Sequence, residues 1–202
     1  MARSWAALLV ALVVTACGVQ SPLPQTPVDV ALQNGDIRGL DRCPGSGAIA
    51  SYLQDLKRKN VDAYTGIQDG WKQLQDSGAQ DAAIVTYTDS PASCDGKLGV
   101  SEGAAATSFV IKYRDSGAAG SAWQRGILGF PTPSAGQQVP GLVLGKATGL
   151  GASSWEYQVT NGAAAVYLAF WQHGSYDVFV LTDDLDVGTS RKLARAVDAR
   201  IH

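Results

Sequence analysis

The sequence predicts an α+β domain of two layers, in which helices pack on one face of a mostly antiparallel sheet. Some segments are rich in β-branched and aromatic residues, whereas others carry apolar residues every three or four positions, as amphipathic helices do. Asn161-Gly162 and His173-Gly174 lie between strand-like segments as tight-turn signals, which favours antiparallel pairing. The 202 residues, 46% of them hydrophobic, fit one globular domain with a substantial core.

Helices are expected in four segments. Ile49, Tyr52, Leu53 and Leu56 have the spacing of one helical face, which predicts a helix over residues 48–59. The other expected helices are a short one around residues 67–75, an Ala-rich one from Asp115 or Ser116 to about residue 128, and a last one over residues 190–201.

Strands are expected where runs of β-branched and aromatic residues end at turn signals. The last three such segments should form an antiparallel meander, because only short turns separate them. The segments are residues 82–88, 108–114, 142–144, 155–160, 164–172 and 176–182.

A weak internal similarity suggests a strand-helix duplication. Residues 109–114 precede Asp115 and an Ala-rich helix, and residues 176–182 precede Asp183 and the last helix. Two such halves would together give helices on one face of one sheet.

The N-terminus has the features of an export signal. Arg3 precedes the apolar run 5–14, and Thr15 and Ala16 are small. The apolar run is too short for a span of about 20 residues, so a retained transmembrane helix is the weaker interpretation.

The segment Val14-Thr15-Ala16-Cys17 resembles the lipobox of bacterial lipoproteins, in which a branched residue stands three positions before an obligatory Cys. The resemblance covers only the first 17 residues. It implies removal of a signal peptide over residues 1–16 and a diacylglyceryl group on Cys17, with acyl chains such as palmitate holding the chain on a membrane. The alternative is an ordinary signal peptide that contains a Cys. Because Gly18 and not Asp follows Cys17, the resemblance favours the outer membrane in bacteria that have one; the cell membrane stays open.

The two other cysteines are expected to form a disulfide. Lipidation of Cys17 leaves Cys43 and Cys94, an even pair in an exported chain, where disulfides persist. A metal or redox pair is the alternative. The sequence contains no C-x-x-C and only two His, so few further ligands are present for such a pair.

Residues 17–46 are expected to form a lipidated tether, and residues 47–202 the globular domain. Residues 18–46 contain four Pro and several Gly without sustained periodicity, and the tether would end near Cys43.

One segment of the sequence matches a catalytic motif. Gly99-Val100-Ser101-Glu102-Gly103 is a G-x-S-x-G, and Ser101, Asp115 and His173 follow the chain order of an α/β-hydrolase triad. The surrounding sequence does not suit that fold, because no buried strand precedes Ser101. A Gly-rich loop is therefore expected, with Ser101 and His173 kept as weak catalytic candidates.

Asp183, Asp184 and Asp186 are weak candidates for a metal site. Carboxylate oxygens at short spacing suit Ca²⁺, but the segment lacks the 12-residue calcium-loop pattern. Carboxylates before a helix are also favoured as caps, so no metal or other cofactor is expected.

Aromatic residues of the last three strands are the ligand-binding candidates. Trp155, Tyr157, Trp171 and Tyr176 would line a concave site if they shared the face that no helix covers, beside residues 129–153. The alternative is that such side chains belong to the core, since alternation must place some on each face.

Charge argues against nucleic acid as a partner, because the formal charge is −2 and the basic residues are scattered. The expected protein is a membrane-anchored, extracytoplasmic lipoprotein that binds an envelope ligand or protein. Two alternatives stay open: a serine hydrolase using Ser101 and His173, and a purely structural spacer.

Overall fold

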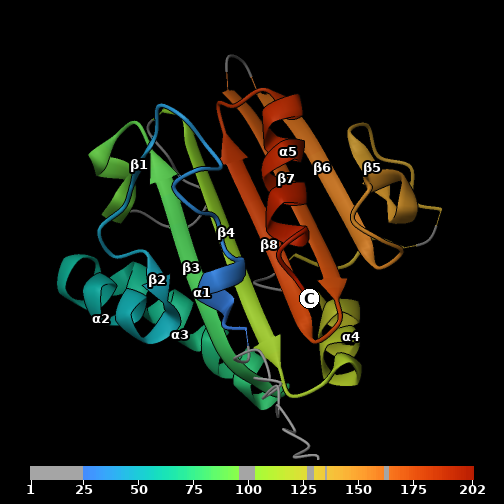
Figure 1. Ribbon diagram of the computed structural model, residues 1–202, viewed down its shortest axis with the longest axis horizontal. Helices are drawn as coiled ribbons and strands as arrows, with labels where there is room; N and C mark the ends of the chain where they lie inside the picture. The colour runs from blue at the N-terminus through green and yellow to red at the C-terminus, as the bar shows by residue number, and fades with distance from the viewer. Residues whose placement is uncertain (1–24, 96–102, 127–129, 135, 162–163) are drawn as a thin grey trace, which may run out of the picture.

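The protein is described from a computed structural model, which places residues 25–95, 103–126, 130–134, 136–161 and 164–202. One antiparallel sheet runs through the body with helices on both of its faces, which makes three layers (Figure 1). The α+β class and the antiparallel sheet predicted from the sequence are therefore confirmed.

The sheet has eight strands in the order β1-β3-β4-β8-β7-β6-β5, with β2 also paired to β3. Every pairing is antiparallel, and the expected meander is formed by β6, β7 and β8. The strands are β1 (Asp41–Arg42), β2 (Gly47–Ala48), β3 (Ala79–Thr88), β4 (Ala105–Tyr113), β5 (Leu142–Leu144), β6 (Ser154–Asn161), β7 (Ala164–His173) and β8 (Tyr176–Asp183).

The helices agree with the apolar periodicity at four places and add a short one that it did not predict. They are α1 (Pro27–Val30), α2 (Ile49–Lys59), α3 (Val61–Asp76), α4 (Ser116–Arg125) and α5 (Val187–Asp198), with 3-10 turns η1 (Pro91–Asp95) and η2 (Gly145–Thr148). In α2 the side chains of Ile49, Tyr52 and Leu56 are buried, as their spacing predicts.

The helices cover both faces of the sheet, so the expectation of helices on one face is wrong. Helices α2, α3 and α4 pack on the face that contains Ile84, Phe109 and Phe179. Helices α1 and α5 pack on the other, against Val110 and Val178. The physical reason is that β4 and β8 are apolar on both sides, so each face needs a cover.

The folded body begins well before the boundary expected at residue 46. Val30, Ala31 and Leu32 are fully or almost fully buried on the α5 face of the sheet, where their segment packs against β3 and β4, and Ile37 and Cys43 are also buried. Residues 25–46 are thus part of the packed body and not a free tether. Few residues in this segment are regular, which is why the sequence pattern did not identify it.

The strand-helix similarity is only local. Both helices follow adjacent antiparallel strands, β4 and β8, and both begin at an Asp cap, Asp115 and Asp186. However, α4 and α5 lie on opposite faces of the sheet, so the expected duplication on a single face does not hold.

Cys43 and Cys94 form the expected disulfide, with their Cα atoms 5.3 Å apart. The bond ties the segment between β1 and β2 to η1, near the end of β3 where Cys43 N donates to Thr86 O. Among the described helices, none has the length and apolar character needed to cross a membrane.

Candidate functional site

The candidate site is a polar cleft at the end of the sheet where β3 begins and β4 ends. It is bordered by the C-terminus of α3 and by one side of α4 from its first turn to its last residue, and has a volume of about 640 Å³. Its lining residues are mostly polar or charged: Asp76, Ser77, Arg114, Asp115, Gly117, Ala118, Ser121 and Arg125.

Both signs of charge meet in this cleft. Arg114 Nε lies 3.3 Å from Asp115 Oδ2, and the Asp115 carboxylate accepts a hydrogen bond from Ala118 N at 2.8 Å, which caps α4. That backbone hydrogen bond, helped by Arg114, holds the pKa of Asp115 below its ordinary value. Guanidinium donors, carboxylate acceptors and two hydroxyls suit a polar ligand that carries both donors and acceptors.

A buried acid lies under α4, close to the cleft. Asp177 in β8 has no exposed surface, and its side chain shares the α4 face with Phe179, because alternate residues of a strand face the same way. Neither of its carboxylate oxygens, nor the buried Tyr113 hydroxyl, has a hydrogen-bond partner of good geometry within the described residues.

Burial raises the pKa of Asp177 to about 8, although the nearby Tyr113 hydroxyl and Arg125 pull it downward. Strongly perturbed acids are common in functional sites, so Asp177 marks this end of the sheet as the candidate. Asp177 was not among the residues predicted from the sequence, although an Asp within the apolar segment Tyr176-Asp177-Val178-Phe179-Val180 is a visible signal.

A second buried acid, on the opposite face, has its partners in place. Glu156 in β6 accepts from Tyr167 Oη at 2.9 Å and from Arg191 Nε at 2.9 Å, and a second Arg191 nitrogen donates to the same carboxylate. Arg191 lies in α5 and is partly exposed, so this ion pair joins α5 to the sheet. Its satisfied hydrogen bonds indicate a structural role.

Among the described residues, the catalytic candidate His173 has Asp198 as its hydrogen-bond partner. His173 Nδ1 lies 2.9 Å from Asp198 Oδ1, which also accepts from Trp171 Nε1 at 2.8 Å. Asp115, the acid expected in the triad, instead caps α4. Ser101 lies outside the described residues.

The four aromatic ligand candidates do not share a face. Trp155 and Tyr157 lie on the α4 face, whereas Trp171 and Tyr176 lie on the α5 face. Strand register explains this, because Trp155 pairs with Phe170, which places the next residue, Trp171, on the other side. Trp155, Trp171 and Tyr176 are almost completely buried, so the interpretation as core residues holds for them and the expected aromatic site is not formed.

The Asp cluster serves local structure. Asp186 Oδ1 accepts from Thr189 N at 2.9 Å and caps α5, and Asp184, at φ 52°, accepts from Ala165 N at 3.1 Å. Within the part of the chain that the structure describes, no group of three or more His, Cys, Asp or Glu side chains is arranged to hold a metal ion. Cys17, the lipidation candidate, lies outside the described residues.

Fold and site together define a three-layer α+β domain, closed by a disulfide, with a polar cleft at one end of its sheet. No protein family matches the chain, and a search of the curated proteins finds no match.

Proposed function

We propose that the protein is a lipid-anchored, extracytoplasmic lipoprotein of the bacterial envelope that binds a polar ligand or protein segment through the cleft between α3 and α4. The observation that carries the proposal is the use of the cysteines. The chain has three Cys; Cys43 and Cys94 are paired with each other, and the remaining one is the lipobox Cys17. A disulfide also fits an oxidising compartment outside the cytoplasm.

The binding role rests on the chemistry of the cleft. Arg114 and Arg125 supply charged donors, Asp76 and Asp115 supply acceptors, and the cleft is open to solvent at the surface. Polar groups that converge in a concave site are the usual means of orienting a ligand.

Lipidation is tested by mass spectrometry of the full chain expressed in a bacterium and extracted from its membranes. The expected N-terminus is Cys17 carrying acyl chains, and Cys17→Ser should release the protein from the membrane fraction. An unmodified Cys17 thiol in the membrane-extracted protein would contradict the proposal.

Binding is tested with a photo-crosslinking amino acid at Ser121, which lines the cleft, in the full chain in living cells. The matched control carries the same group at Gln68, an exposed position of α3 in the same layer but outside the cleft lining. The proposal expects a defined adduct from position 121 that is absent from position 68. Equal or absent crosslinking from both positions would contradict the cleft as the binding site.

The alternative, a serine hydrolase, has one favourable contact, the hydrogen bond between His173 and Asp198. It is tested with a fluorophosphonate probe, which labels activated serines. Labelling that Ser101→Ala and His173→Ala both abolish would establish the hydrolase, and the binding proposal expects no such labelling.

A further inference from the structure

The described body meets the N-terminal segment at Gln25, which several hydrogen bonds hold in place. Its backbone carbonyl accepts from Lys112 Nζ and from Tyr176 Oη, each at 2.8 Å. Its side-chain oxygen accepts from His202 N at 3.3 Å, and its side-chain amide donates to Arg200 O. These contacts come from β4, β8 and the C-terminus, so the position of Gln25 on the body is fixed by distant parts of the chain.

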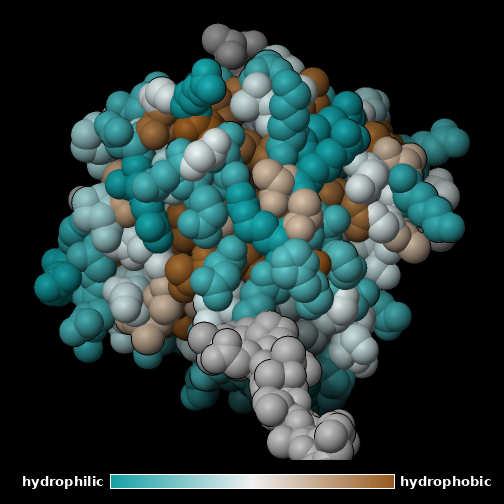
Figure 2. Space-filling model, viewed as in Figure 1, coloured by the Kyte–Doolittle hydropathy of each residue, from teal (hydrophilic) through white to brown (hydrophobic). Residues whose placement is uncertain are grey.

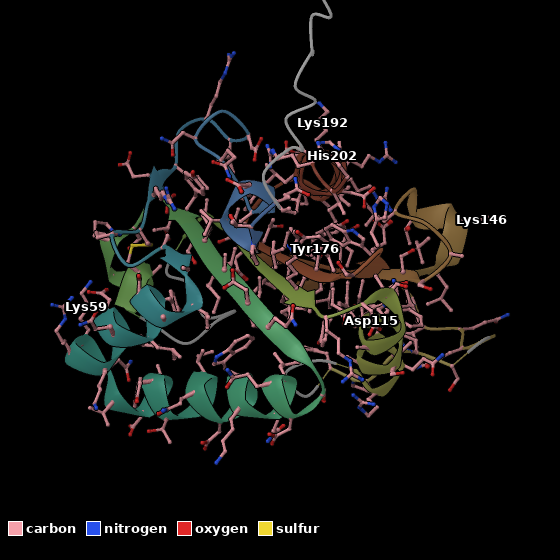
Figure 3. The ribbon with its side chains drawn as sticks, turned by 60° about the horizontal axis from the view of Figure 1, so that its bottom comes forward. Lys59, Asp115, Lys146, Tyr176, Lys192 and His202 are labelled. Atoms are coloured by element: carbon pink, nitrogen blue, oxygen red, sulfur yellow. A yellow bond between two sulfur atoms is a disulfide. The ribbon has the colours of Figure 1, made fainter. Side chains whose placement is uncertain are left out.

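All of these partners lie at one end of the sheet. Lys112 is next to the last residue of β4 and pairs with Tyr176, the first residue of β8. Figure 3 turns this end toward the viewer and shows Tyr176, His202 and Asp115 there. The polar cleft opens at the same end, because Arg114 and Asp115 follow directly after β4.

Little chain is left between this end and the proposed anchor. Cys17 and Gln25 are eight residues apart, a distance of at most about 28 Å even in a fully extended chain. The nine residues of β4 make the sheet about 30 Å tall. The far end, with Ala105, Asp183 and η1, could approach the lipid only if the tether were stretched along the whole body.

We infer that the end of the body formed by Gln25, Tyr176 and His202 faces the lipid bilayer. The inference rests on the proposed lipidation of Cys17 and goes beyond it by assigning an orientation. The cleft then lies near the lipid headgroups and takes a ligand at the membrane surface, whereas the disulfide end stays turned away. Figure 2 shows the α1 and α5 face with hydrophilic residues over most of it and hydrophobic residues in small separate areas, as expected for a face that stays in water.

The orientation is tested by energy transfer in vesicles of phosphatidylethanolamine and phosphatidylglycerol that contain acceptor-labelled lipid. The full, lipidated chain carries a fluorescent amino acid in place of His202, at the near end, or of Ala92, in η1 at the far end; both positions are exposed. Transfer should be clearly higher from position 202. Inserting about 20 Gly and Ser residues between Gly18 and Val19 adds a flexible coil of about 25 Å and should remove most of the difference.

Two readouts separate the possible failures. Mass spectrometry of the same samples reports the acylation of Cys17, and an unmodified thiol would overturn the proposed anchor and this orientation together. Acylated protein with equal transfer from both positions, or higher transfer from position 92, would overturn the orientation and leave the anchor standing. The Cys17→Ser protein gives the baseline transfer without an anchor.

Discussion

Two buried acids of this protein occupy opposite electrostatic environments. Glu156 is almost fully buried but has Arg191 and Tyr167 as partners, whereas Asp177 is fully buried and its carboxylate oxygens have none of good geometry among the described residues. Water solvates a carboxylate far better than an apolar core does, so the unpaired acid favours its neutral form.

The raised pKa of Asp177 predicts a pH-dependent stability. Its pKa is about 8 in the folded protein against an ordinary value of 3.8, so the folded state binds a proton that the unfolded state releases. The contribution is complete below about pH 4 and is lost as the pH rises to about 8. We expect the free energy of unfolding to fall by about 2–4 kcal/mol between about pH 5 and pH 8.

Urea unfolding followed by circular dichroism at several pH values checks this expectation. Asp177→Asn cannot ionise and should flatten the pH profile, with higher stability than the native chain at about pH 8. Asp69→Asn on the exposed side of α3 is the control and should leave the profile unchanged. A native chain whose stability does not decline between these pH values would show that Asp177 is not buried in an unpaired state.

Removing the carboxylate of Glu156 should destabilise the protein, because this acid, unlike Asp177, has its partners in place. Glu156→Ala leaves the Tyr167 hydroxyl and the Arg191 guanidinium without their acceptor, and because Arg191 is partly exposed, water relieves some of the cost. We expect a loss of about 2–4 kcal/mol. Tyr167→Phe, which removes one hydroxyl and keeps the ion pair, should cost about 1 kcal/mol in the same denaturation assay. Equal stability of Glu156→Ala and the native chain would exclude a structural role for this cluster.

At the scale of elements, side-chain caps mark where three of the helices, α3, α4 and α5, begin. Asn60, Asp115 and Asp186 each accept a hydrogen bond from a backbone amide three residues further along, in α3, α4 and α5 respectively. An exposed first-turn amide without such an acceptor would depend on water. The caps therefore link single polar residues to the placement of the helices that cover both faces of the sheet.

Removing the cap of α5 should destabilise the protein measurably. Asp186 accepts from both the backbone amide and the hydroxyl of Thr189, and these bonds lower its pKa. We expect Asp186→Ala to lower the unfolding midpoint measurably, because the first-turn amide of Thr189 loses its acceptor. Asp186→Asn keeps a good cap and should cost clearly less in thermal or chemical unfolding. The role of this side chain as a cap would be rejected if Asp186→Ala and Asp186→Asn were equally stable.

At the scale of the whole molecule, segments that are far apart in sequence close the structure. Residues 27–32 pack over β3 and β4, Arg200 donates to the carbonyls of Val30 and Ala31 and pairs with Asp36, and the disulfide joins residues with a sequence separation of 51. Such links connect the first and last parts of the body. The segments joined by these links should unfold together with the sheet and not separately.

The N-terminal segment can be tested as part of the core. Leu32 is almost fully buried, so Leu32→Ala should cost about 2–4 kcal/mol by creating a cavity and losing apolar contact. Val61→Ala, at a largely exposed aliphatic residue of α3, is the matched control and should change stability by less than about 0.5 kcal/mol. A Leu32→Ala effect as small as that of the control would place this segment outside the cooperative unit.

The disulfide should stabilise the body chiefly by limiting the unfolded chain. For its loop length, replacing Cys43 and Cys94 together by Ser should cost about 4 kcal/mol. Cys17→Ser should leave the unfolding of the body unchanged. Comparing unfolding midpoints with and without reductant gives an independent measurement, and a native chain insensitive to reductant would contradict the predicted contribution.

Much of the local structure could be predicted from the sequence. The strands at 82–88 and 142–144, the meander from residue 155 to residue 182 and the helix face of Ile49, Tyr52 and Leu56 all follow from short-range periodicity. Periodicity is a property of neighbouring residues, because side chains repeat every two positions in a strand and about every 3.6 in a helix. The pairing of Cys43 with Cys94 followed from counting cysteines, and it is confirmed.

The sequence by itself determined most of the longer helices and strands, though not α1, β1 or β2, and which two cysteines pair in the body. Only the tertiary structure decided that β8 inserts between β4 and β7, that α5 covers the face opposite to α4, and that Asp177 is buried without a good partner. The physical reason is that these features depend on contacts between residues far apart in the chain. A strand that is apolar on both sides, such as β8, is compatible with a cover on either face, and packing of the whole chain selects the arrangement.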